Sequence, residues 1–151
     1  MATDTAIAGT TYKSLEHAYN GGVTTPAAGV YTALPPYGLP PWEASPEYEE
    51  MLVAYLGLDG VGTKQGGFRG RNIGVDIVIV GATKADVETS KNALFAAMPT
   101  TSRFSVTIPG GTARPGCKLV RGSGEIKDWS TLDGKILACL MLRIRQMSLE
   151  S

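Results

Sequence analysis

Residues 71–81, RNIGVDIVIVG, decide the fold of this chain. Every second position in the stretch is apolar, and these positions are Ile73, Val75, Ile77 and Ile79. Such alternation predicts a β-strand with one buried face. Val78 and Val80 add apolar side chains to the opposite face, so we expect the strand to become buried on both sides toward its end.

One helix is predicted directly after this strand. Thr83 followed by Asp86 is typical of a capping box, and Pro99 ends the run. Apolar residues recur at helical spacing, at Val87, Leu94 and Met98. That spacing predicts a helix with one buried face.

Further strands are predicted after the helix. Their sequences are RFSVTI (103–108), TARPGCKLVRG (112–122), EIKDW (125–129) and GKILACLMLRIRQM (134–147). Half of the last strand is apolar on both faces, so we expect it to be covered twice, by the core and by a helix or another subunit.

This order of elements predicts an α+β fold, an antiparallel split β-barrel or sheet with one main packed helix and an irregular Pro-rich N-terminal arm. The length of 151 residues fits one domain. We expect residues 1–65 to be an arm or long loop with a short acidic helix, 66–147 to be the β-barrel body, and 148–151 to be a tail.

The N-terminal arm contains six of the nine prolines within its first fifty residues, which disfavours a regular helix or ladder. Its aromatic residues Tyr31, Tyr37 and Trp42 need a surface to cover, on the same chain or on a neighbour.

A short helix is predicted at about residues 46–56. Ser45 resembles an N-cap, Pro46 suits the first helical position, and three glutamates follow where the helix dipole favours anions.

The glycine-rich stretch GLDGVGTKQGGFRGRN, residues 57–72, approaches the pattern of a phosphate-binding loop. That loop needs a lysine and then a hydroxyl residue after its second glycine, whereas here Thr63 precedes Lys64 and Gln65 follows it. It also needs a strand before it and a helix after it, and the sequence predicts the reverse. We therefore expect a flexible connection.

The charges divide unevenly along the chain. Lysine and arginine number 14 and aspartate and glutamate 14, which argues against a basic nucleic-acid-binding domain. Residues 1–62 nevertheless carry one cation and seven anions, a net charge of −6, and the remainder carries +6. The two halves match either within one chain or between copies.

No catalytic, cofactor or metal site is predicted. His17 is the only histidine, and no nucleophile motif accompanies it. Cys117 and Cys139 lie in strand-like runs, either reduced and buried or bridged to each other. The N-terminus lacks the pattern of a signal peptide, so we expect a soluble protein made in the cytoplasm.

Arginines gather at the ends and faces of the predicted strands. Solvated ladders with acidic partners or an interface role would both explain them. Our candidate interface residues are Tyr31, Tyr37, Trp42, Arg69, Arg71, Arg143 and Arg145.

Residues 66–147 resemble the N-terminal barrel of siphophage distal tail proteins and related minor tail proteins. The matching features are the strand from Arg71 to Gly81, the helix from Asp86 to Met98, the strand from Phe104 to Ile108, Gly111 and Arg114 at a hairpin, and the closing strands from Leu119 to Ile144. A second, carbohydrate-binding domain found in many of those proteins has no counterpart here, so we do not expect saccharide binding.

The resemblance implies a split barrel of the tail-tube type without catalysis or cofactor. It implies a homohexameric ring in the virion tail at the junction of tube and tip or baseplate, assembled in the host cytoplasm. Partners would be other copies and the tube and tip proteins, with DNA only as cargo in the lumen and no membrane. A tail tube or tail terminator subunit is the alternative. A different class is a small cytoplasmic ligand-binding or enzymatic domain using residues 57–67.

Overall fold

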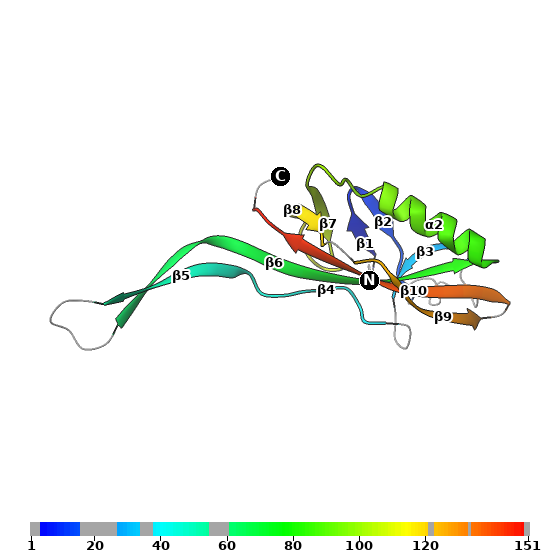
Figure 1. Ribbon diagram of the computed structural model, residues 1–151, viewed down its shortest axis with the longest axis horizontal. Coiled ribbons are helices and arrows are strands. Elements are labelled where there is room, and N and C mark those ends of the chain that lie inside the picture. Colours follow the sequence, from blue (N-terminus) through cyan, green and yellow to red (C-terminus); the bar gives the residue numbers. More distant parts are fainter. Residues whose placement is uncertain are drawn as a thin grey trace.

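The chain folds into an antiparallel sheet that curls into a nearly closed barrel, with one helix packed on it (Figure 1). The computed structural model describes residues 4–15, 27–33, 38–54, 61–120, 123–132 and 134–149, and for 49–54 and 61–67 it describes the backbone alone. The elements are β1 (Thr5–Ile7), β2 (Thr10–Tyr12), β3 (Gly29–Thr32), β4 (Trp42–Glu43), β5 (Glu47–Ala54), β6 (Val61–Gly81), α2 (Lys84–Ala96), β7 (Phe104–Thr107), β8 (Arg114–Leu119), β9 (Ile126–Leu132) and β10 (Lys135–Gln146).

The barrel follows the strand order β2-β1-β7-β8-β10-β6-β3. Its two ends meet where Ser14, just after β2, forms a bridge with Thr32 of β3. There the Thr32 amide donates a hydrogen bond to the Lys13 carbonyl at 2.9 Å. The expected α+β split barrel with one packed helix is therefore confirmed.

Strand β6 is the longest of the described strands, with 21 residues in one continuous run. One edge pairs with β10 from Arg71 to Gly81. The other edge pairs in turn with β3, β4 and β5 as it runs back toward Val61. The strand predicted from RNIGVDIVIVG is confirmed, and it begins ten residues before Arg71, at Val61.

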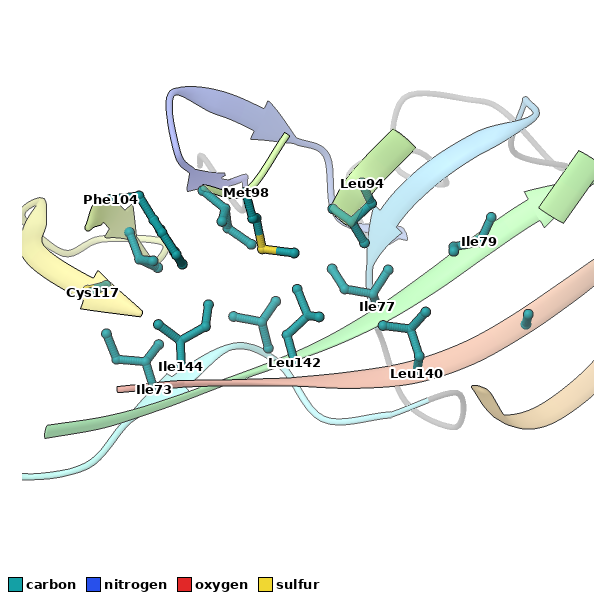
Figure 2. Packing of buried hydrophobic residues seen from close by; sticks show 14 of the residues in the cluster. Ile73, Ile77, Ile79, Leu94, Met98, Phe104, Cys117, Leu140, Leu142 and Ile144 are labelled. Carbon is teal, nitrogen blue, oxygen red and sulfur yellow. The ribbon is translucent and has the colours of Figure 1, made fainter. Parts of the chain in front are cut away.

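The main core lies inside the barrel, where the alternating isoleucines of β6 meet β10 and the helix (Figure 2). Ile77 and Ile79 of β6, Leu140 and Leu142 of β10, and Leu94 of α2 are among its buried members. The predicted buried face of the helix is thus the face that fills the barrel.

A second, smaller core covers the opposite face of β6 and β10. Val78, Val80 and Leu137 pack there against Leu15 and Ala33 from the N-terminal region. The double burial predicted for the last strand is confirmed at Leu137, whereas the apolar residues that follow it on this face of β10 are half-buried. Its second cover includes a segment of the same chain.

Helix α2 begins as the sequence predicts. The Thr83 side chain accepts a hydrogen bond from the Asp86 amide at 3.3 Å, which caps the helix. The helix ends at Ala96, with Ala97 as its C-cap, shortly before Pro99. It is too short and too polar to cross a membrane, and no other described helix is long and apolar enough to do so.

The short helix predicted at residues 46–56 is wrong, because Glu47–Ala54 is strand β5. Its glutamates favour a helix locally, but β5 pairs along one edge with β6 over Val61–Gly70, with two register shifts near its start. Long-range pairing therefore overrides the local capping signal.

The glycine-rich stretch is also not the flexible connection that we expected. From Val61 onward its residues belong to strand β6, while Gly57–Gly60 lie outside the described residues. The predicted division at residue 65 stays a prediction, and β6 runs through it without a break.

Candidate interaction surface

An arm of two strands projects from the barrel. Beyond Arg71 strand β6 has no partner in β10, because the pairing of β10 ends where Gln146 meets Arg71. From there to Val61, β6 is paired with β5 alone among the described residues. We call this hairpin, Glu47–Ala54 with Val61–Gly70, the arm, and Figure 1 shows it extending away from the body.

In the part that the structure describes, the two strands of the arm pair with each other and have no third strand beside them. Two strands without a covering layer are marginally stable in water, and each presents an edge of unpaired backbone groups. At its root, Tyr48 and Phe68 pack edge to face with ring centroids 5.8 Å apart. An arm of this kind gains stability when another surface covers it.

The inner side of the root is fixed by a cluster of charges around Glu43. The Arg114 guanidinium donates to both Glu43 oxygens, at 2.9 and 2.8 Å, and Arg71 donates to Oε2 at 3.3 Å. These hydrogen bonds from Arg114 and the two positive charges hold the pKa of Glu43 below its ordinary value. Glu43 thereby ties β4 to both β6 and β8.

A second cluster around Arg145 holds the arm's root from β10. Its guanidinium donates to Asn72 Oδ1 at 2.7 Å, to Glu47 Oε2 at 3.1 Å and to the Arg69 carbonyl at 3.3 Å. Gly70 makes room for it, because a Cβ there would lie 2.6 Å from Arg145 Nη2. Arg145 therefore binds both strands of the arm.

Trp42 fastens the segment before the arm. It stands opposite Gly74 in the register of β4 and β6. A Cβ at Gly74 would lie 2.3 Å from Trp42 Cε2, so the indole lies directly on the glycine. The residue is still 44% exposed, which leaves part of it available to a partner.

The candidate interface residues do not form one site. Arg69, Arg71 and Arg145 come together at the root of the arm. Arg143 is exposed on β10. Tyr31 packs against the second core and donates its hydroxyl to the Ala27 carbonyl at 2.9 Å. Tyr37 lies outside the described residues.

Two residues of the root, Glu43 and Arg114, were missed as site residues. The opposite net charges of residues 1–62 and of the remainder were the available signal, because Glu43 and Arg114 pair across these two parts within one chain. Within the described ranges, no three His, Cys, Asp or Glu side chains cluster. Both cysteines are free, Cys117 buried and Cys139 half-buried.

Large apolar side chains are exposed at several places on the described surface. They are Leu39, Trp42, Tyr48, Val120, Trp129, Met147 and Leu149. Trp42 and Tyr48 belong to the root of the arm. Val120 borders a groove beside the end of α2.

Known proteins show little similarity to this chain. No protein-family model and no curated protein matches it. One solved structure, that of SPP1 Dit (gp 19.1), is similar to the chain with a TM-score of 0.40 and 15% identity. That protein is described as a paradigm of the hub adsorption apparatus in phages that infect Gram-positive bacteria. The match covers 66% of this chain, which spans 40% of that protein. What this chain does is therefore inferred from its own sequence and geometry.

Proposed function

We propose that the chain is a structural virion protein of a tailed bacteriophage, which forms a ring in the tail at the junction between tube and tip or baseplate. The resemblance of residues 66–147 to distal tail proteins suggests this class. The split barrel with one helix is the fold that the resemblance implies. The ring would be a homohexamer around a lumen through which DNA passes, with tube and tip proteins as neighbours.

The arm is the observation that carries the proposal. Strand β6 continues for ten residues beyond its pairing with β10, and only β5 accompanies it among the described residues. The two charge clusters and Trp42 fix the root of this otherwise uncovered hairpin. A projecting element with a fixed root suits contact with a neighbouring subunit better than contact with its own barrel.

Such contacts are expected to be head-to-tail. The arm extends to one side of the molecule in Figure 1, and in the proposed ring it would meet the body of the next copy while that copy's arm reaches onward to a third. A heterologous contact of this kind gives a closed ring when its rotation closes, and a filament when it does not. The proposed ring is the case in which this rotation closes.

The enzymatic alternative finds less support. A phosphate-binding loop joins a strand to a helix, whereas Val61–Gln65, within the predicted loop 57–67, are paired strand residues of the arm. A tail tube or tail terminator subunit is compatible with the same arm. The three tail positions differ in their neighbours, which the geometry of one subunit does not specify.

Shortening the arm tests the proposal. Replacing residues 51–64 by Asn-Gly keeps the pair of Glu50 with Gln65 at the root and closes it with a tight turn. We expect the wild-type chain to form rings and the shortened chain to be a folded monomer. Light scattering after size exclusion, negative-stain images and urea denaturation would measure these outcomes.

A chain lacking residues 148–151 is the control, and it should still assemble. Persistent rings in the shortened variant would show that the arm is not the connector. A wild-type chain that stays monomeric at high concentration, without rings in the images, would contradict the ring itself.

A further inference from the structure

A groove lies between the end of helix α2 and the segment that follows strand β8. Its volume is about 570 Å³, and Phe95, Met98, Leu119 and Val120 contribute its apolar lining. Lys91 and Lys118 also line it, with Glu125 as the acidic residue among the lining side chains. The groove is therefore apolar with a surplus of positive charge.

The wall of the groove is locally specialised. Gly124 has a φ of +89°, and a Cβ there would lie 2.0 Å from Phe95 Cζ, so the phenyl ring sits directly on the glycine backbone. Beside it, Ser123 Oγ is buried and has no hydrogen-bond partner among the described residues. This oxygen is enclosed by the protein itself, so an occupant would meet the other side chains of the lining.

An occupant that fits these features has apolar side chains and an acidic group. The sequence that joins β5 to β6, Tyr55-Leu56-Gly57-Leu58-Asp59-Gly60, has this composition. Its two leucines and tyrosine suit the apolar lining. Asp59 suits Lys91 and Lys118.

The groove cannot receive this segment from its own chain while the arm is extended. The arm runs away from the body in Figure 1, whereas the groove lies on the body beside α2. We propose that the groove receives residues 55–60 of a second copy of the chain. This inference rests on the proposed ring and names the surface at which one subunit holds the arm of the next.

Cross-linking between copies tests the inference on the full-length chain. Val120 is 36% exposed at the groove, so Val120→Cys is mixed with a second protein carrying Leu58→Cys, and both are oxidised mildly. We expect a disulfide-linked dimer from this mixture. Asn92→Cys, on an exposed part of α2 outside the groove, is the matched control and should give none with Leu58→Cys.

Charge exchange is the second measurement. Lys118→Glu and Asp59→Lys should each weaken self-association about two- to five-fold, and the two changes together should restore it. Equal losses in the double variant would overturn the pairing of these charges.

The other outcomes separate the inference from the ring. Rings that form without the Val120–Leu58 cross-link would overturn the groove assignment and leave the ring intact. A cross-link from Val120→Cys to Leu149→Cys instead would assign the groove to the C-terminal segment and overturn the assignment of residues 55–60. A protein that never assembles would contradict both the groove pairing and the proposed function.

Discussion

Glu43 is the residue at which the acidic and basic parts of the chain meet. Its carboxylate accepts hydrogen bonds from Arg71 and Arg114, and the side chains of all three are largely shielded from water, with 21% of Glu43 and 12% of Arg71 exposed. Shielded ion pairs are costly to break on one side only, because the remaining charges lose their partner. Glu43 joins three strands, so its loss should lower the stability of the fold more than the loss of a single surface carboxylate would.

Replacing Glu43 by Gln should lower the free energy of unfolding by about 1–2 kcal/mol, since two guanidinium groups lose a charged acceptor. Urea denaturation at pH 7 measures the loss. Glu47→Gln is the control, because the Glu47 side chain is 57% exposed and should contribute much less. Equal effects of the two variants would contradict the special role of Glu43.

The pH dependence of the Glu43 effect follows from its lowered pKa. A carboxylate whose pKa is lower in the folded than in the unfolded chain stabilises the fold fully above its ordinary pKa, near 4.5. The stabilisation is lost as the pH falls through the folded-state value. The difference between wild type and Glu43→Gln should therefore persist at pH 6 to 7 and shrink below about pH 4.5.

At the residue scale, the sequence indicated some of the site but not its pairing. Arg71 and Arg145 were chosen because arginines gather at strand ends, and both lie at the root of the arm. Their acidic partners Glu43 and Glu47 lie 28 and 98 residues away in the chain. Contacts over such separations depend on the register of the sheet, which local patterns do not reveal.

Among the elements, strand β4 has only two residues, Trp42 and Glu43. Its backbone pairing with β6 is correspondingly short. Beside the ion pairs of Glu43, the indole of Trp42 on Gly74 adds contact with the sheet. The absence of a side chain at Gly74 is what permits this packing.

Gly74→Ala should therefore displace Trp42 and destabilise the fold by about 1–2 kcal/mol. In a Trp42→Ala background the same change should cost less than about 0.5 kcal/mol, because the clash no longer exists. Denaturation of the four proteins in this cycle measures the coupling. In a Trp129→Ala background, which removes the other tryptophan, Gly74→Ala should keep its full cost. If the stability losses of Trp42→Ala and Gly74→Ala simply add in the double variant, the stacking is refuted.

The elements from residue 71 onward were predictable because their signals are local. The alternation in RNIGVDIVIVG and the cap formed by Thr83 and Asp86 both describe what the structure contains. Strand β5 was not predictable in this way. Its glutamates after Pro46 favour a helix, and only the distant partner strand in a glycine-rich stretch makes it β-structure.

At the scale of the whole molecule, the two cysteines report on different parts of the fold. Cys117 is fully buried in the main core, and this burial raises the pKa of its thiol to about 11. Cys139 is half-buried, and burial together with the charges of Asp128 and Asp76 raises the pKa of its thiol. Both effects lower the fraction of reactive thiolate.

Alkylation of the native protein at pH 8 should therefore modify Cys139 slowly and Cys117 only when the whole barrel unfolds. Mass spectrometry of peptides after timed treatment with iodoacetamide measures both rates. Shortening the arm should leave the rate at Cys117 unchanged, since none of the described side chains of the arm belongs to the main core. Equally fast modification of the two thiols in native protein would contradict this picture of the barrel.

The continuity of β6 determines how the molecule would bear mechanical load. A pull on the arm along its axis passes directly into the strand that pairs with β10 over eleven successive positions, from Arg71 to Gly81. Hydrogen bonds loaded in this direction are sheared together, whereas those of a peeled strand break one after another. In the proposed ring, a pull on the arm would thus load the whole interior of the subunit at once, and each barrel would hold the arm of its neighbour against that load.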